Sequence, residues 1–326
     1  MRDVTVIGAG VIGLSTAICL AEAGAQVAVH AAEPPERTTS AAAGALWGPH
    51  LVGADDRIGR WAEETRRRLL ELMTFPFVQE CSGMSAEAGV AATGSQPPEV
   101  AATAPGVTAC PPGEVPPGYA VAWRFRAPLV SMPDYLGYLR ERYLAAGGQP
   151  IVSAAYPTLA AAAQEAGGGV LVNCAGTGAR SLVPDPAVVA VRGQVVIARN
   201  PGITEFFVGA GHPAAELTYV FPHAGRVVLG GTEVHDDWRL APDPGTADQI
   251  LAACAAVVPA LAGATVLEHR VGLRPYRPAV RLETEQAADG TAVVHNYGHG
   301  GSGVTLSWGC AQDAAALALA ALDARL

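Results

Sequence analysis

The pattern of hydrophobic and polar residues predicts parallel βαβ structure near both ends of the chain and an antiparallel sheet between them. Val4–Ile7 has the character of a short buried strand, and Leu14–Ala23 is apolar almost all round, as in a buried helix. Gly24 follows at the place where a glycine ends a helix, and Gln26–His30 continues as a second strand. The first 50 residues are therefore expected to form a β-α-β unit.

Further along the chain, the pattern predicts a series of helices. Residues 54–80 have an amphipathic helical pattern, and a proline in the first turn opens a helix over Pro133–Ala146. Asp248–Val258 predicts another helix, and Gly303–Leu322 predicts a long apolar one. Residues 82–120 are rich in Gly, Pro, Ala and Ser and are expected to form loops and short strands.

The middle of the chain changes character, because short apolar runs there predict successive strands of an antiparallel sheet. These runs are Val191–Arg199, Glu205–Val208, Thr218–Pro222 and Arg226–Gly230. Gly169–Asn173 and Val293–Tyr297 predict two more strands, each followed by a glycine-containing loop. The expected architecture is a nucleotide-binding domain assembled from separated segments, with a second domain inserted.

A glycine-rich turn joins the first strand to the first helix. It reads Gly8-Ala9-Gly10-Val11-Ile12-Gly13, the spacing of a dinucleotide-binding fingerprint. In such a motif the first glycine permits the tight turn, the second lets the backbone approach a pyrophosphate, and the third lets helix and strand pack closely. The pyrophosphate then lies at the helix N-terminus, where free N–H groups and the helix dipole favour an anion. The motif alone does not distinguish FAD from NAD.

An acidic residue that binds ribose hydroxyls is expected about 20 residues after this motif. His30-Ala31-Ala32 occupies that place, so Glu33 is the candidate, with a solvated loop glutamate as the alternative. The next segment, Arg37-Thr38-Thr39-Ser40, offers a cation and hydroxyls near the pyrophosphate. The small residues of Ala42-Ala43-Gly44-Ala45-Leu46-Trp47 would allow backbone to lie against a flat ring.

A second glycine-rich loop opens the last helix. It reads His295-Asn296-Tyr297-Gly298-His299-Gly300-Gly301-Ser302-Gly303-Val304-Thr305, with four glycines between residues 298 and 303. Such a loop brings backbone close to a ligand, and the helix N-terminus stabilises negative charge such as that of a reduced flavin. His295 and His299 are expected to be hydrogen-bonded core residues rather than catalytic bases.

A third segment, Gly272–Arg281, contains three arginines separated by prolines. The prolines hold the backbone extended, so each arginine projects in a defined direction. One buried arginine in an acidic protein would mark a point of anion recognition, because the guanidinium pairs with a carboxylate through two parallel hydrogen bonds. The pattern does not say whether Arg274, Arg277 or Arg281 is that residue.

The composition narrows the class of protein. The chain has 326 residues, which suggests roughly two domains, and half of them are hydrophobic, which excludes a disordered chain. All 21 basic residues are Arg, and with 30 Asp and Glu the net charge of −9 argues against nucleic-acid binding. The basic run Arg66-Arg67-Arg68 is expected to be a solvated helix face. No apolar run reaches the ~18 residues of a membrane span, and no secretion signal is expected at the N-terminus.

The cysteines indicate a reducing compartment. Six are spread along the chain without a CxxC pair, which fits buried thiols in the cytoplasm, although Cys81 and Cys110 lie in loop-like sequence and could pair. The absence of Lys beside abundant Ala, Gly, Arg and Pro suggests GC-rich coding and therefore a bacterial source. No metal site is predicted, and a homodimer is possible.

Together these motifs resemble one family, the FAD-dependent D-amino acid oxidases. Eight motifs keep the family's order over nearly the whole chain, and the last two are highly specific. They are VIGAGVIGLSTA (Val6–Ala17), AAGALW (Ala42–Trp47), VNCAGTGA (Val172–Ala179), RGQVV (Arg192–Val196), YVFP (Tyr219–Pro222), LGGT (Leu229–Thr232), GLRPYRPAVRLE (Gly272–Glu283) and HNYGHGGSGVTLSWGCA (His295–Ala311).

The resemblance implies an α/β fold with a Rossmann-like FAD-binding domain and an inserted, mainly antiparallel β-sheet substrate domain. Residues 1–50, 130–182 and 272–326 are expected to form the FAD-binding domain. Residues 51–129 and 183–271 are expected to form the substrate-binding domain.

The resemblance also assigns the site. Arg274 matches the family's arginine for the substrate carboxylate, Tyr219 the tyrosine that shares this carboxylate, and Gly301 the glycine whose carbonyl accepts a hydrogen bond from the substrate amine. The residues expected to bind FAD, without a covalent bond, are Gly8, Ala9, Gly10, Val11, Ile12, Gly13, Glu33, Arg37, Thr38, Thr39, Gly44, Ala45, Leu46, Trp47, Ala175, Gly176, Gly300, Gly301, Gly303, Val304 and Thr305.

The reaction implied by the resemblance is hydride transfer from the Cα of a D-amino acid to flavin N5. Dioxygen reoxidises the flavin and gives hydrogen peroxide, and the imino acid hydrolyses to a 2-oxo acid and ammonia. The cofactor performs the redox step, so no side-chain acid or base is needed beside Cα.

Two departures from the family bear on the substrate. Vertebrate members carry a lid tyrosine four residues before the position of Tyr219, where this chain has Ala215, so a more open site is expected. The related D-aspartate oxidases use additional arginines, whereas Glu216 is the nearby charge here, which favours neutral substrates. The alternatives are a D-aspartate oxidase, a flavin oxidase for glycine or an N-methyl amino acid, and a dinucleotide-binding sensor without turnover.

Overall fold

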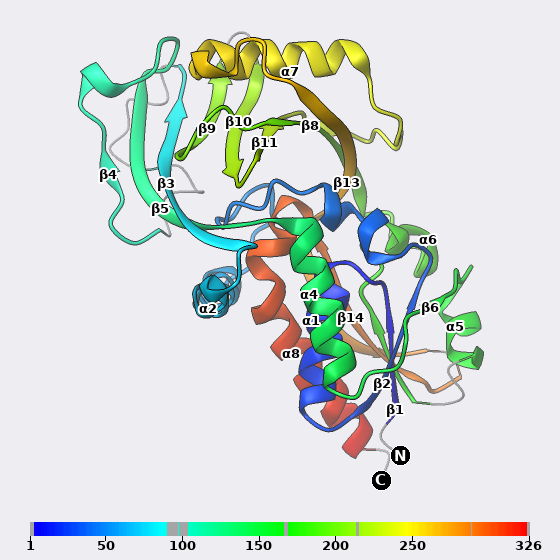
Figure 1. The fold of residues 1–326 in the computed structure, drawn as a ribbon. Helices are drawn as coiled ribbons and strands as arrows, with labels where there is room; N and C mark the ends of the chain where they lie inside the picture. The colour runs from blue at the N-terminus through cyan, green and yellow to red at the C-terminus, as the bar shows by residue number, and fades with distance from the viewer. Residues whose placement is uncertain are drawn as a thin grey trace.

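The computed structural model describes residues 3–89, 97, 104–165, 169–212, 215–287 and 289–324. Over these residues the strands form one 14-stranded sheet, with a parallel part and a mainly antiparallel part in two lobes (Figure 1). This is the expected mixed α/β architecture. The expected absence of the lid rests on residues 213–214 and on the side chains of Ala215 and Glu216, which lie outside the described part of the chain.

The parallel part has the order β14-β7-β1-β2-β6 and carries helices on both faces (Figure 1). Alternate residues of one strand belong to opposite faces: Val170 and Val172 pack on the side of α8, and Leu171 packs on the side of α5. This double burial explains the continuous apolar runs in the sequence. The elements are β1 (Asp3–Ile7), α1 (Val11–Glu22), β2 (Gln26–Ala31), α4 (Met132–Ala145), β6 (Val152–Ser153), α5 (Leu159–Glu165), β7 (Val170–Asn173), α6 (Ala179–Leu182), β14 (Ala292–His299) and α8 (Gly303–Asp323).

The antiparallel part has one face under α7 and the other toward the parallel lobe (Figure 1). Val220 packs toward α7, so its neighbours Tyr219 and Phe221 face the opposite way. β3 pairs with β9 in parallel, and the other pairs are antiparallel. The elements are β3 (Val78–Glu87), β4 (Thr108–Ala109), β5 (Val121–Val130), β8 (Val189–Arg199), β9 (Phe206–His212), β10 (Ala215–His223), β11 (Arg226–Gly230), β12 (Val234–His235) and α7 (Pro244–Val257).

One long strand connects the two parts of the sheet. β13 (Val266–Gln286) pairs with β8 up to Tyr276 and with β14 from there on, and the register shifts between Tyr276 and Arg281. The segment predicted to be extended by its prolines is the middle of this strand. Its length was not predicted, because the two halves pair with strands from distant parts of the chain.

The amphipathic helix expected over residues 54–80 is shorter than predicted. α2 runs over Ile58–Glu71 and is followed by a 3₁₀ turn, η3 (Leu72–Thr74), and then by β3. β3 and β5 pair along their whole length, from Val78 opposite Val130 to Glu87 opposite Val121. The expectation of loops and short strands over 82–120 was wrong at its start, because β3 is a ten-residue strand reaching residue 87. The pairing with β5, rather than local β propensity, stabilises β3 as a strand.

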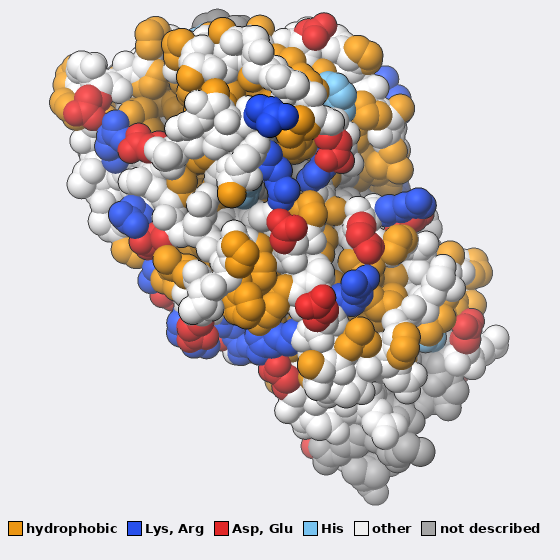
Figure 2. Space-filling view, in the orientation of Figure 1, with side chains coloured by type: hydrophobic (Ala, Val, Ile, Leu, Met, Phe, Trp, Pro, Cys, Tyr) orange, Lys and Arg blue, Asp and Glu red, His pale blue; other side chains and the backbone are white. Residues whose placement is uncertain are grey.

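α2 packs against α8, although residues 51–129 were assigned to the substrate-binding domain. The side chain of each arginine in Arg66-Arg67-Arg68 pairs with a glutamate of the same helix. The expected solvated face is confirmed only for Arg67, because Arg66 and Arg68 are half-buried and lie over the rings of Trp47 and Trp308. On the face drawn in Figure 2, Arg side chains are interspersed with Asp and Glu. All six cysteines are free thiols, so Cys81 and Cys110 do not pair.

The described residues bear on two further classes of function. They contain no helix that is long and apolar enough to cross a membrane. Nor does this part of the chain bring together three or more His, Cys, Asp or Glu side chains that could hold a metal ion.

Candidate active site

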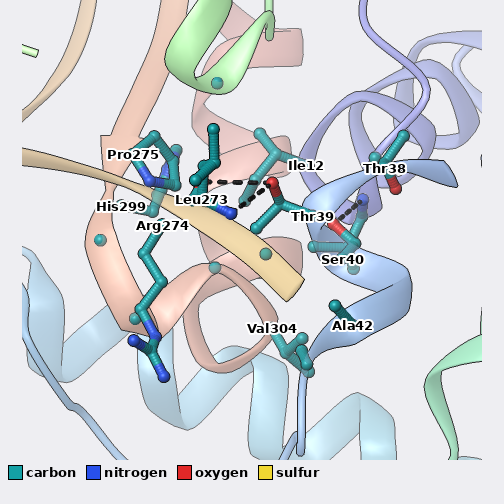
Figure 3. A pocket seen from close by; sticks show the side chains of 18 of the residues that line it. Ile12, Thr38, Thr39, Ser40, Ala42, Leu273, Arg274, Pro275, His299 and Val304 are labelled. Atoms are coloured by element: carbon teal, nitrogen blue, oxygen red, sulfur yellow. Dashed lines mark hydrogen bonds between the residues drawn. The ribbon is translucent and has the colours of Figure 1, made fainter. Parts of the chain in front are cut away.

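A cavity of about 710 Å³ lies where the two parts of the sheet meet. It extends from the β1–α1 turn, past the loop after β2 and the loop that opens α8, to Tyr219 on β10 and Arg274 on β13. In Figure 3, Arg274 lies on one side of the cavity and Thr38 and Ser40 lie on the other. The cavity therefore joins the glycine fingerprint to the arginine-containing segment, which the sequence could only place separately.

The β1–α1 turn has the close contacts that its glycines were predicted to allow. Gly8 has a φ of +113°, and a Cβ there would lie 2.4 Å from the carbonyl oxygen of Cys174. A Cβ on Gly13 would lie 1.9 Å from the carbonyl oxygen of Gly8, so this glycine packs helix against strand and does not line the cavity. Gly10 faces Ser40, whose Oγ accepts a 3.0 Å hydrogen bond from the backbone N–H of Val11 at the start of α1.

The loop after β2 carries the expected residues along one side of the cavity. Glu33 and Arg37 are exposed and line it. The hydroxyl of Thr38 donates to the carbonyl of Pro35 over 2.8 Å. The hydroxyl of Thr39 donates to the carbonyl of Leu273 over 3.1 Å (Figure 3). These bonds fix the loop to itself and to β13, so the Thr38 and Thr39 side chains have a structural role in addition to lining the cavity.

Tyr156 is a lining residue that the sequence did not predict. Its hydroxyl lies 2.5 Å from Nδ1 of His30, at the end of β2. It follows β6, which is only two residues long and pairs with the end of β2. So short a strand leaves no recognisable pattern, and no local signal could have identified Tyr156.

The loop over residues 42–50 places its small residues on the cavity but turns Trp47 away from it. Gly44, Ala45 and Leu46 line the cavity, whereas Trp47 is 1% exposed and donates from Nε1 to the carbonyl of Ala62 over 2.9 Å. Trp47 thus fills the contact with α2. The hydroxyl of Thr305 bonds both the N–H and the carbonyl of Gly48, which fixes this loop to the start of α8.

The glycine-rich loop before α8 lies along the cavity with residues 300, 301 and 303–305, and Ala175 and Gly176 line it as well. Two buried polar atoms on this side, Oδ1 of Asn296 and Nε2 of His299, have no hydrogen-bond partner among the described residues. Burial lowers the pKa of His299 to about 3, so its ring is neutral. Nε2 of His295 lies 3.0 Å from Glu285, away from the cavity lining, as expected for a core histidine.

The structure distinguishes the three arginines of β13. Arg274 lines the cavity and donates from Nη1 to the carbonyl of Thr232 over 2.8 Å, and its guanidinium covers Gly193. Arg277 pairs with Asp185, and Arg281 pairs with Glu283 and Glu285. Arg274 is therefore the arginine in position to bind an anion in the cavity.

Tyr219 faces the same end of the cavity. It stacks on Phe221 with ring centroids 4.6 Å apart, and Gly230 and Gly231 leave room for its hydroxyl. Burial raises the pKa of Tyr219, and the nearby guanidinium of Arg274 opposes this only in part. The hydroxyl is therefore protonated and able to donate a hydrogen bond beside Arg274.

The residues of this cavity fit FAD. The close turn at Gly8 and Gly10 leaves the α1 N-terminus open to a pyrophosphate, and the unpartnered atoms of Asn296 and His299 offer hydrogen bonds to a polar ligand. Arg274 and Tyr219 at the other end suit a small carboxylate. Fold and site together define a dinucleotide-dependent oxidoreductase.

Comparison with known proteins agrees with this class. The family model described as FAD-dependent oxidoreductase matches residues 3–317, and the chain belongs to this family. It is similar to proteins named D-amino-acid oxidase from Rubrobacter xylanophilus (47% identity, covering 98% of this chain and 96% of the relative) and Streptomyces coelicolor (47%, 97% and 96%). It is also similar to human D-aspartate oxidase (34% identity, 96% and 94%).

Solved structures show the same fold at low sequence identity. Glycine oxidase from Bacillus cereus has a TM-score of 0.74 at 18% identity, covering 100% of this chain and 96% of that one. L-Proline dehydrogenase from P. horikoshii has a TM-score of 0.77 at 13% identity, covering 97% and 92%. The protein is an FAD-dependent oxidoreductase, and FAD is its cofactor.

Proposed function

We propose that this protein catalyses the oxidative deamination of neutral D-amino acids. The observation that carries the proposal is the meeting of Arg274 and Tyr219 in the cavity that also contains the Gly8–Gly13 turn. FAD bound in the cavity would supply the redox chemistry, namely acceptance of a hydride from the substrate Cα and transfer of the electrons to O₂ to give H₂O₂; the imino acid would then hydrolyse to a 2-oxo acid and ammonia.

In this proposal Arg274 binds the substrate carboxylate. A guanidinium can form two parallel hydrogen bonds with a carboxylate, and the bond from Nη1 to Thr232 holds the side chain in a defined orientation. The protonated hydroxyl of Tyr219 donates a further hydrogen bond, and its stacking on Phe221 orients the ring. The carbonyl of Gly301 accepts a hydrogen bond from the substrate amine.

Stereoselectivity follows from these three contacts. With the carboxylate and the amine both held, only one enantiomer can direct its Cα–H toward the flavin. Burial lowers the pKa of His299 to about 3, so its ring is too weak a base to take a proton at physiological pH, and the hydroxyl of Tyr219 is protonated; neither is poised as a general base. This agrees with a reaction in which no side chain removes the Cα proton.

The proposed FAD site uses both glycine-rich loops. The α1 N-terminus at Gly10–Ile12 holds the pyrophosphate, Glu33 binds ribose hydroxyls, and the segment 303–305 lies at the flavin edge. Residues 1–50, 130–182 and 272–326 form the FAD-binding domain in this proposal, and residues 51–129 and 183–271 form the substrate-binding domain. Because α2 packs on α8, residues 58–71 contact the proposed FAD-binding domain, although this division assigns them to the substrate-binding domain.

A peroxide assay with matched D- and L-amino acids tests the function. D-Alanine and D-methionine should give peroxide and consume O₂, and their L-enantiomers should not. If D-aspartate exceeds every neutral substrate by about tenfold, the protein is a D-aspartate oxidase. If no amino acid reduces the flavin of the FAD-loaded protein, it is a sensor without turnover.

Two further proposals concern the state of the protein. Light scattering of the FAD-loaded protein tests the expected homodimer. Location in the cytoplasm is supported by the six free cysteines, and cell fractionation with detection of the native protein tests it.

A further inference from the structure

An imidazole–carboxylate pair lies at the substrate end of the cavity, and the proposed reaction does not use it. Nε2 of His50 and Oε1 of Glu233 form a hydrogen bond, although 183 residues separate them in the chain. His50 lines the cavity. The side chain of Glu233 is 19% exposed and that of His50 is 40% exposed. Glu233 is not itself a lining residue, and its carboxylate reaches the edge of the cavity through its contact with His50.

This pair lies beside both proposed substrate anchors. The backbone of His50 exchanges two hydrogen bonds with the hydroxyl of Ser302, and a Cβ on Gly301 would lie 2.8 Å from the carbonyl oxygen of His50. Glu233 directly follows Thr232, whose carbonyl accepts the hydrogen bond from Arg274. An acidic group therefore lies near both the amine anchor and the carboxylate anchor.

Glu233 carries a negative charge at neutral pH. Burial pushes the pKa of its carboxyl up, but the hydrogen bond with His50 and the nearby guanidinium of Arg274 outweigh burial and hold the pKa below its usual value. His235 on β12 is the remaining titratable group that acts on this carboxyl. Its ring lies against Tyr276.

We propose that Glu233, oriented by His50, determines side-chain specificity: it disfavours D-amino acids with an acidic side chain and favours those with a cationic one, such as D-arginine and D-lysine. The inference rests on the proposed function, because it takes Arg274 and Gly301 as the anchors of the substrate. With these two groups bound and Cα–H directed toward the flavin, only the side chain remains free to approach Glu233. Like charge then repels and opposite charge attracts.

Binding can be measured without turnover by using six-carbon carboxylates that lack an α-amine. Hexanoate, 6-aminohexanoate and adipate differ only in a neutral, cationic or anionic far end. Titration of the FAD-loaded protein, followed by flavin absorbance, should rank 6-aminohexanoate tightest and adipate weakest. Each step should be about tenfold in Kd, as for one partly buried charge pair. Equal Kd values for the three ligands would overturn the proposal.

Glu233→Gln tests the residue itself, because it removes the charge but keeps the shape and a hydrogen-bonding group. The variant should bring the three Kd values within about twofold of one another. Glu268→Gln is the matched control. It makes the same change in net charge, but Glu268 is half exposed and pairs with Arg270, and neither His50 nor Arg274 acts on its carboxyl. The control should keep the wild-type order of Kd values. If both variants lose this order equally, the net charge of the protein causes the ranking, and the proposal is overturned.

His50→Phe should change the preference for a cationic ligand in the opposite direction from Glu233→Gln. The ring remains but its nitrogens are lost, so the Glu233 carboxylate loses a partner and should attract a cation more strongly. The Kd ratio of hexanoate to 6-aminohexanoate should rise by about threefold, whereas Glu233→Gln lowers it. A fall in this ratio for a folded, FAD-loaded His50→Phe protein would contradict the role given to the pair.

Kinetics separate this inference from the proposed function. For the wild type, kcat/KM should be measurable for D-alanine, higher for D-arginine than for D-glutamate, and the ratio of the last two should fall about tenfold in Glu233→Gln. Turnover of D-alanine with an unchanged ratio would refute the inference alone. Absence of turnover with every D-amino acid would refute the proposed function, and the inference would fall with it.

Discussion

Arg274 shows how one residue acquires a role that its neighbours lack. Arg277 and Arg281 lie on the same strand and carry the same group, but carboxylates hold both of them. Arg274 is anchored by the neutral carbonyl of Thr232. Its guanidinium lies flat over Gly193, where a Cβ would come within 2.6 Å of Nη1. A fixed cation at the cavity wall is what the recognition of a carboxylate requires.

Replacement of this guanidinium should impair catalysis without releasing FAD. A hydrogen bond to a charged group is worth roughly 1.5–3 kcal/mol. Loss of two in Arg274→Ala should therefore lower kcat/KM for D-alanine by about 10² to 10⁴. Arg274→Lys should also be poor, because an ammonium cannot reproduce the planar fork. Flavin content and thermal midpoint, measured alongside, should stay near wild type.

Arg140→Ala is the control for this experiment, since Arg140 lies on α4, is 45% exposed and pairs with Glu36. It should leave kcat/KM within about twofold of the wild type, as for an exposed charge pair. Near-normal kcat/KM in a folded, FAD-loaded Arg274→Ala protein would remove Arg274 from the site.

Tyr219→Phe should have a smaller effect. The substitution removes one hydroxyl donor and keeps the stacked ring on Phe221, so the expected loss in kcat/KM is about tenfold. The loss should appear mainly in KM if the hydroxyl holds the carboxylate equally in the ground and transition states. An unchanged KM and kcat would show that the hydroxyl does not contact the substrate.

At the scale of elements, the contact between α2 and α8 holds the loop that carries Leu46. Nε1 of Trp61 on α2 donates to Asp313 on α8 over 2.8 Å, and the hydroxyl of Thr65 accepts the N–H of Trp308 over 3.1 Å. Gly309 lets the helices approach, because a Cβ there would lie 2.3 Å from Cα of Trp61. The contact between α2 and α8 lies away from the cavity, but it helps to hold the lining loop that carries Leu46 in place.

Gly309→Ala should separate the two helices. The new methyl meets backbone that cannot move aside easily, so we expect a loss of about 1–3 kcal/mol in the free energy of unfolding. Gly59→Ala on α2 is the matched control, because a Cβ there meets nothing within 4 Å. It should be neutral or stabilising by up to about 1 kcal/mol. Denaturant unfolding measures both, and equal stabilities of the two variants would contradict this account of the contact.

For the whole molecule, the junction between the two lobes makes stability depend on pH. His223 at the end of β10 lies near Arg226, near Asp134 on α4 and near Arg270 on β13. Burial lowers its pKa from 6.5 to about 4, and Arg226 adds to this effect. Between these values the unfolded chain binds a proton that the folded protein does not, so stability falls as the pH drops from about 6.5 to 4.

This shift corresponds to at most about 3 kcal/mol. The thermal midpoint of His223→Gln should therefore depend less on pH than that of the wild type over this range. The two proteins should differ in slope between pH 6.5 and about 5.5, above the range in which ordinary carboxylates titrate. Parallel curves over that interval would exclude His223 as the cause.

The protein as a whole should hold FAD without a covalent bond. Cys174 lines the cavity, but burial raises its pKa to about 12, so the thiol is protonated and a poor nucleophile. The purified protein should be yellow, and acid precipitation should release free FAD into the supernatant. Flavin that stays with the precipitated protein would contradict this expectation, and bound NAD would contradict the cofactor assignment.

The sequence by itself determined the parts of this protein that depend on near neighbours. The Gly8–Gly13 turn, α1 and β2 follow from glycine spacing and apolar runs within 25 residues, and the structure confirms them. The same holds for α8, whose long apolar pattern is local. Nearly all the residues predicted to bind cofactor or substrate line the cavity, because they belong to short motifs in which a missing Cβ or a hydroxyl has a recognisable place.

Only the tertiary structure decided what depends on contacts between distant segments. β3 became a strand through its pairing with β5, Trp47 turned toward α2 to reach the carbonyl of Ala62, and β13 is long because β8 and β14 continue it on either side. The pairing of His50 with Glu233 is of the same kind. Such contacts depend on sheet register and helix packing, which arise from the summed burial of the whole chain and leave no pattern in any short segment.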